Sequence, residues 1–121
     1  MPELTITKSF VIEVAHYFAH QPEGHPNRRM HGHSYYVDVI LSGDPDPKTG
    51  MIHHFEDLAD ILETTRQKLD HRLLNDIEDL GPPSMENIAK WVANTLAPQL
   101  STLKAVRLRR PTAREEACYT L

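Results

Sequence analysis

Residues 30–41 read Met30-His31-Gly32-His33-Ser34-Tyr35-Tyr36-Val37-Asp38-Val39-Ile40-Leu41 and predict a β-strand that begins with two histidines. Alternate residues of a strand point to the same face, so His31 and His33 share a face with Tyr35, Val37, Val39 and Leu41. Two imidazoles on one face, roughly 7 Å apart at their Cα atoms, can lean toward a single ion. The His-x-His pair is therefore a candidate metal site that still needs a third ligand.

His16 is the first candidate for this third ligand, because it lies in the other long strand-like run, residues 4–18. If the two runs pair as antiparallel neighbours, three neutral histidines converge and one coordination position stays open. This is the ligand set of a catalytic zinc site rather than of a structural one. The alternative is that the histidines only form hydrogen bonds. All but one of the eight histidines lie between His16 and His54, which favours a metal site, although His20 and His25 fit a solvated loop equally well.

The rest of the chain changes between strand and helix periods. Residues 4–18 and 30–41 predict two strands joined by a turn-rich loop at 19–29, and residues 43–50 predict a turn followed by a short extended piece at 51–54. Apolar residues at helical spacing predict helices at about 55–69 and, after the N-cap Ser84, to about Leu96. Residues 103–108 and 117–121 predict two closing strands. The order ββααββ indicates one α+β domain spanning 1–121, an antiparallel four-stranded sheet with two helices on one face.

Composition limits the kind of protein this is. The 121 residues suit one domain, and no run approaches the roughly 18 apolar residues of a membrane span. The N-terminus lacks the features of a secretory signal, and the lone Cys118 agrees with a reducing compartment, so we expect a cytoplasmic protein. The net charge of −4 disfavours a nucleic-acid partner. One cluster of arginines is an exception that could hold phosphate groups or form a solvated face: Arg107, Arg109, Arg110 and Arg114.

Five fragments occur in a specific order and spacing. They are Val14-Ala15-His16, Pro22-Glu23-Gly24-His25, Met30-His31-Gly32-His33-Ser34, Leu69-Asp70-His71 with Leu74-Asn75-Asp76, and Pro83-Ser84-Met85-Glu86-Asn87-Ile88-Ala89-Lys90-Trp91. Together they resemble the family of 6-pyruvoyltetrahydropterin synthase and 6-carboxytetrahydropterin synthase, which has the tunnelling fold. The bacterial 6-carboxytetrahydropterin synthases of queuosine biosynthesis are the most similar group. The resemblance covers nearly the whole chain.

The resemblance implies a chemistry and an assembly. His16, His31 and His33 take the family's Zn²⁺ positions, and the substrate is 7,8-dihydroneopterin triphosphate, whose side-chain oxygens bind the metal. Asp70 and His71 match an Asp-His pair that moves protons together with a cysteine thiolate. Without the family, His71 would be interpreted as a histidine near a helix C-terminus. Members form homohexamers of two stacked trimers, with active sites between subunits.

Three positions depart from the family pattern. Asn27 stands where the cysteine is expected, Arg110 or Pro111 aligns with the glutamate that anchors the pterin, and His54 replaces a common aspartate. Asparagine cannot act as a base, and an arginine side chain cannot accept hydrogen bonds from ring N–H groups. Glu115 or Glu116 could supply the missing carboxylate. The candidate site residues are therefore His16, His31 and His33 for the metal; Asp70, His71, His25 and Asn27 for catalysis; and Ser84, Glu86, His54, Arg110, Glu115 and Glu116 for the substrate.

Two functions follow from this pattern. The first is a zinc-dependent lyase of the pterin synthase type with an altered acid–base set, acting on dihydroneopterin triphosphate or a related phosphorylated heterocycle. The second is a catalytically weak or inactive homologue that contains zinc and binds a pterin-like or purine-like ligand.

Overall fold

A four-stranded sheet forms the framework of the structure, a computed structural model that describes residues 2–121. Its strands are β1 (Thr5–His16), β2 (His31–Ser42), β3 (Leu103–Arg110) and β4 (Glu115–Thr120). They lie in the order β1-β2-β3-β4, and each neighbouring pair is antiparallel. The two helices lie between β2 and β3 in the sequence. The predicted order ββααββ and the α+β class are therefore confirmed.

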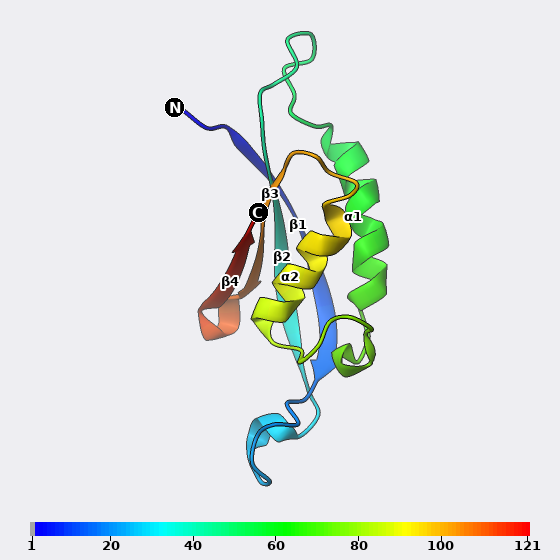
Figure 1. The fold of residues 1–121 in the computed structure, drawn as a ribbon, viewed down its shortest axis with the longest axis vertical. Helices are drawn as coiled ribbons and strands as arrows, with labels where there is room; N and C mark the ends of the chain where they lie inside the picture. Colours follow the sequence, from blue (N-terminus) through cyan, green and yellow to red (C-terminus); the bar gives the residue numbers. More distant parts are fainter. Residues whose placement is uncertain (1) are drawn as a thin grey trace.

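Both helices cover the same face of the sheet (Figure 1). Helix α1 (Phe55–Leu69) and helix α2 (Met85–Leu96) lie side by side there, as their apolar stripes predict. The N-cap of α2 is Ser84, whose side chain accepts a hydrogen bond from the Asn87 N–H at 3.2 Å. The buried residues of the two helices are Leu58, Leu62, Thr65 and Leu69 of α1, and Ile88, Ala89, Val92, Ala93 and Leu96 of α2.

Every second residue of the strands faces these helices and forms the core. This inner face holds Ile12 and Val14 of β1, Tyr35, Val37, Val39 and Leu41 of β2, and Val106 and Leu108 of β3. His16, His31 and His33 continue the same alternation at the end of the β1–β2 pair, where His16 lies opposite His31. The core thus ends in a cluster of imidazoles.

The outer face carries a buried carboxylate. Asp38 is only 4% exposed; it accepts hydrogen bonds from the Ser9 hydroxyl at 2.6 Å and from Arg109 Nε at 2.7 Å. Arg107 lies 3.7 Å from the same carboxylate and also pairs with Glu116. The alternation of the strand therefore divides the arginine cluster: Arg107 and Arg109 are ion-paired on the outer face, whereas Arg110 belongs to the inner face. The arginines therefore form neither one shared phosphate site nor a simple solvated face.

Several boundaries differ from the predictions. Residues 51–54 form a bend rather than an extended strand, because they lead directly into α1. Strand β4 begins at Glu115, two residues early, since Glu115 and Glu116 pair with Arg110 and Arg109 of a longer β3. Strand β1 ends at His16 rather than at residue 18. Within residues 2–121, neither helix is long and apolar enough to cross a membrane.

Candidate metal centre

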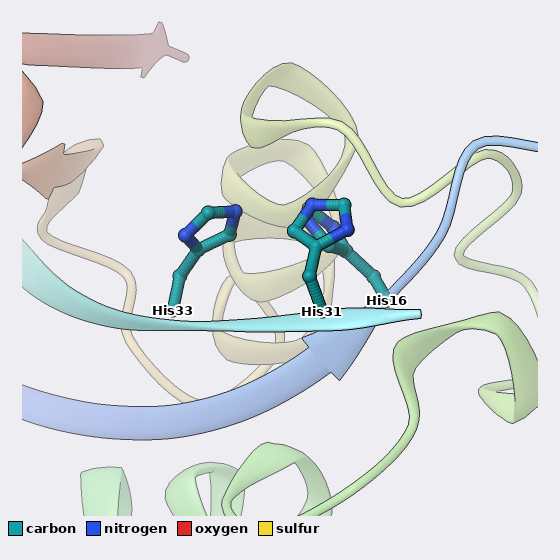
Figure 2. A group of neighbouring side chains, drawn as sticks. All are labelled: His16, His31 and His33. Atoms are coloured by element: carbon teal, nitrogen blue, oxygen red, sulfur yellow. The ribbon is translucent and has the colours of Figure 1, made fainter. Parts of the chain in front are cut away.

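Three histidines meet where β1 ends and β2 begins. Their rings rise from the same side of the two strands, as Figure 2 shows. His16 pairs with His31, and their ring centroids lie 4.6 Å apart. His33 lies opposite Val14, with its ring centroid 4.9 Å from that of His16 and 4.9 Å from that of His31. The strand register thus produces the convergence that the sequence predicts.

Backbone carbonyls orient two of the rings. His16 Nδ1 lies 2.9 Å from the carbonyl oxygen of the buried Pro83, and His31 Nδ1 lies 2.7 Å from that of Arg29. A carbonyl only accepts, so each Nδ1 carries the proton and each Nε2 presents its lone pair. The Nε2 of His16 is buried and has no hydrogen-bond partner. A buried acceptor without a partner is costly, and a bound cation would satisfy it.

Burial favours the neutral form of two of these imidazoles, His33 and His16. Burial lowers the pKa of His33 to about 4, and the positive charges of Arg110, His16 and His31 add to this effect. Burial also lowers the pKa of His16, against the opposing hydrogen bond to Pro83. The neighbouring Tyr35 keeps its proton, because burial raises its pKa to about 12. His16 and His33 are therefore held in the neutral form in which histidine binds metals.

Gly32 allows the two strands to approach closely between the paired histidines. A Cβ at this position would lie 3.1 Å from the carbonyl oxygen of Val14, tighter than most real contacts. A side chain at this position would require the β1–β2 pair to shift by a few tenths of an ångström between His31 and His33. The glycine thus positions the donors without touching a ligand.

These residues fit a metal ion. One ring nitrogen from each histidine lies within 4.8 Å of the others, and among the described residues no other set of three His, Cys, Asp or Glu side chains is arranged in this way. Bonds of ~2.1 Å to one tetrahedral zinc would bring the nitrogens to roughly 3.4 Å apart, a small ring movement. Three imidazoles, two of them with carbonyl-bound Nδ1 atoms, match the chemistry that zinc prefers.

Asp70 and His71 form a separate unit on the free edge of β1. His71 Nδ1 donates to Asp70 Oδ2 at 2.8 Å, while Asp70 Oδ1 accepts from the Glu13 N–H at 2.8 Å. The hydrogen bonds from Glu13, His71 and Arg66 hold the pKa of Asp70 below its usual range. His71 has a positive φ of 59° and an exposed ring, a backbone conformation that non-glycine residues adopt mainly where the surrounding structure imposes it. His71 and His33 line a common pocket of ≈ 490 Å³ with Glu13, Ser34 and Arg72.

The other predicted residues divide into those near the cluster and those outside it. Ser84 follows Pro83, whose carbonyl holds His16, so the start of α2 adjoins the centre. Glu86, Glu115 and Glu116 line a shared groove of ≈ 600 Å³ between α2 and β4. His25 and Asn27 lie in the loop between β1 and β2, where the Asn27 N–H donates to His25 Nδ1 at 3.1 Å. His54 is the exposed N-cap residue of α1 and does not join the histidine cluster.

Sequence reasoning missed three supporting groups. Arg66 donates to Asp70 at 2.8 Å and to Glu63 at 2.7 Å, so it fixes the carboxylate that holds His71. Asn75 donates to the Tyr17 carbonyl and accepts from the Tyr17 N–H, both at 3.0 Å, and anchors the chain just after His16. The Pro83 carbonyl has no sequence signal. The pair of Arg66 and Asp70 did have a sequence signal, since their i,i+4 spacing permits an ion pair.

The fold and the sequence of this chain are similar to those of known proteins. A Caenorhabditis elegans 6-pyruvoyl tetrahydropterin synthase structure superposes with a TM-score of 0.87 over 100% of this chain and 97% of that one, at 24% identity. In sequence, the chain is 38% identical over 92 residues to a Synechocystis 6-carboxy-5,6,7,8-tetrahydropterin synthase, covering 72% of this chain and 70% of the relative. It is 30% identical over 105 residues to the Bacillus subtilis protein of the same name, covering 82% and 69%.

A family model provides the assignment. Residues 5–120 match the model described as 6-pyruvoyl tetrahydropterin synthase, a range that contains all four strands, both helices and the three converging histidines. The chain belongs to the 6-pyruvoyl tetrahydropterin synthase family.

Proposed function

We propose that this protein is a zinc-dependent lyase of the pterin synthase type. Its substrate would be 7,8-dihydroneopterin triphosphate or a related phosphorylated heterocycle, and its setting the cytoplasmic biosynthesis of queuosine. The observation that carries this proposal is the set of three converging histidines, in which His16 and His31 have Nδ1 bound to carbonyls and Nε2 free. The names of the Synechocystis and Bacillus subtilis relatives support the pterin chemistry.

Each group has a defined role in this proposal. His16, His31 and His33 hold the metal, which when bound supplies Lewis-acid polarisation of substrate oxygens. Asp70 fixes the Nδ1–H tautomer of His71, so His71 Nε2 is free to take or give a proton. Arg66 and the Glu13 N–H hold Asp70 in place.

Self-association as a homohexamer belongs to the same proposal. Strands β1 and β4 are the two edges of the sheet, and β1 is 12 residues long. Only its last part is covered, where Ala15 N donates to the Arg72 carbonyl and His71 N to that of Glu13. Val11 and Tyr36 on the outer face are each 40% exposed. Long open edges and exposed apolar residues are stabilised when sheets from several copies close into a barrel.

A second candidate function is a homologue that binds zinc and a pterin-like or purine-like ligand with little turnover. Asn27 favours it, because this exposed loop residue cannot act as a base at the position where the family is expected to have a cysteine. Arg110 also favours it, because the end of β3 offers a cation instead of a carboxylate.

Turnover by the zinc-loaded protein separates the two functions. The protein is incubated with 7,8-dihydroneopterin triphosphate, and release of triphosphate and acetaldehyde is followed. Release at a rate that depends on stoichiometric zinc supports the lyase. Tight binding of the heterocycle without release of either product supports the binding homologue instead.

A further inference from the structure

Arg110 lies on the same face of the sheet as the histidine cluster. Val106 and Leu108 of β3 are fully buried on the inner face, and Arg110 continues their alternation as the last residue of the strand. The β2–β3 register pairs Arg109 with Tyr36, so the next step along both strands brings Arg110 beside Tyr35. Tyr35 in turn follows His33 on that face, with ring centroids 5.5 Å apart.

The guanidinium of Arg110 has no partner within residues 2–121. Arg107 and Arg109 both pair with Asp38, but no hydrogen bond or ion pair involves the Arg110 side chain, although Glu115 is its cross-strand neighbour. Arg110 is nevertheless partly buried. Its position beside Tyr35, whose ring lies against that of His33, puts the cation next to the three histidines, and the guanidinium remains free to bind something else.

This arrangement places two positive centres on one surface. A metal at the three histidines keeps one open position that accepts an oxygen ligand. A guanidinium offers several N–H donors in a planar fork that suits carboxylate or phosphate oxygens. It cannot accept a hydrogen bond, so it does not suit the N–H edge of a neutral aminopyrimidine.

We propose that Arg110 and the three-histidine centre together bind an oxyanionic group, a carboxylate or a phosphate, of a small ligand. The oxyanion occupies the open metal position on one side and contacts the Arg110 guanidinium on the other. This rests on the metal site of the proposed function, and it assigns a ligand class to the end of β3. It does not require turnover, because it concerns the bound state alone.

Cobalt-substituted protein tests this proposal directly, because the visible absorption of Co²⁺ changes when its open position is filled. Acetate, inorganic phosphate and the neutral ligand imidazole are each titrated into wild type, Arg110→Gln and Arg110→Lys. The matched control is Arg114→Gln, since Arg114 is exposed and lies in the turn beyond the end of β3.

Of acetate and phosphate, one will bind the wild-type protein more tightly. We expect Arg110→Gln to lower the affinity for that anion by roughly ten- to a hundredfold, the effect of losing a charge-assisted hydrogen bond. Imidazole affinity should stay within about twofold, Arg110→Lys should retain part of the anion affinity, and Arg114→Gln should match wild type. Tighter binding of acetate or of phosphate identifies which oxyanion the site takes.

Two results would overturn the proposal. Equal weakening of imidazole and the anions in Arg110→Gln would mean that the substitution only damages the metal site. Unchanged anion affinity in both Arg110 variants would mean that the guanidinium plays no part. A wild-type protein without cobalt absorption contradicts the metal centre itself, whereas absence of lyase turnover with anion binding intact contradicts only the proposed reaction.

Discussion

His16 Nδ1 donates a hydrogen bond to the carbonyl oxygen of Pro83 at 2.9 Å, across 67 positions of sequence. The bond ties the end of β1 to the residue before the N-cap of α2 and fixes which nitrogen of His16 faces the cluster. The geometry of the three histidines therefore depends on helix docking as well as on strand pairing. Loosening of the α2 start would release the ring even if the sheet stayed intact.

Metal content tests the assignment of the three ligands. Wild type should bind one zinc per chain, and His31→Ala or His33→Ala should lose more than the roughly 100-fold in affinity that loss of an outer-shell partner costs. His20→Ala is the matched control, because His20 is exposed and lies outside the cluster. Mass-spectrometric metal analysis after dialysis measures the occupancy. Full zinc occupancy in the His31→Ala/His33→Ala double variant contradicts the assignment.

The metal-free protein should lose stability in mild acid. His33 has a pKa of about 4 in the folded state and about 6.5 when unfolded. Between these values the unfolded chain binds more protons, so the free energy of unfolding falls as the pH drops through this window. Below pH ~4 both states are protonated and this contribution levels off. Above about pH 6.5 His33 is neutral in both states, and its contribution to stability is fully present.

Urea denaturation at pH 7 and pH 5 measures this contribution. His33→Gln should lose less stability than wild type between the two pH values, because it removes the group whose protonation differs. His20→Gln should follow the wild-type curve. A His33→Gln variant as acid-sensitive as wild type would show that other groups account for the whole effect.

Most of the fold could be predicted from local pattern. The alternation of Val37 and Val39 marks the buried face of a strand, and the spacing of Leu58 and Leu62 marks the buried face of a helix. All four side chains are buried in the structure. Antiparallel pairing of the two histidine-bearing strands follows from their being consecutive along the chain, with only a turn-rich loop between them. These features depend on neighbours in sequence or on one hairpin.

The rest depends on tertiary contacts that carry no local signal. The segment after α1 adds a hydrogen bond to the edge of β1 through Arg72 and Ala15, and this docking places His71 beside β1. The four arginines looked like one cluster, whereas the register of β3 sends Arg109 to Asp38 and Arg110 to the other face. The charged start of β4 was missed because Glu115 and Glu116 are poor strand formers that pair with those arginines.

The Asp38 network should contribute measurably to stability. Arg109→Met leaves the buried carboxylate with only Ser9 and the longer contact to Arg107. We expect a clear loss in the free energy of unfolding, smaller than that of breaking a fully buried pair, because these two contacts remain and the Arg109 side chain is partly exposed. Urea denaturation measures it, with the exposed Arg114→Met as control. A loss no larger than that of the control would mean that the ion pair adds nothing.

The oligomeric state tests whether other copies of the chain cover the open edges of the sheet. Sedimentation at micromolar concentration should return a species close to six times the 13.8 kDa chain, since open edges of β1 and β4 need covering. A stable monomer under these conditions contradicts the hexamer. It would also remove the shared active sites between subunits that the proposed hexamer implies.

Restoring a thiol tests whether this pocket has kept the family's reaction. Asn27 lies in the exposed loop between β1 and β2, where its backbone N–H and carbonyl bond to His25 Nδ1 and to the Phe18 N–H. Asn27→Cys keeps both backbone bonds and adds a group of the kind that contributes roughly 10²–10⁴-fold to proton transfer. If only this group is missing, turnover of 7,8-dihydroneopterin triphosphate should rise by a factor in that range.

We expect instead that Asn27→Cys alone does little, because Arg110 leaves the heterocycle misplaced and a misplaced substrate gains little from a better base. Asn27→Cys combined with Arg110→Glu should recover weak turnover, and Asn27→Ser combined with Arg110→Glu is its matched control without a thiol. Release of triphosphate is measured for the unmodified protein, for Asn27→Cys and for the two double variants. Efficient turnover by the unmodified protein would show that His25, His54 or His71 replaces the thiolate, and the inference of a changed ligand would then be wrong.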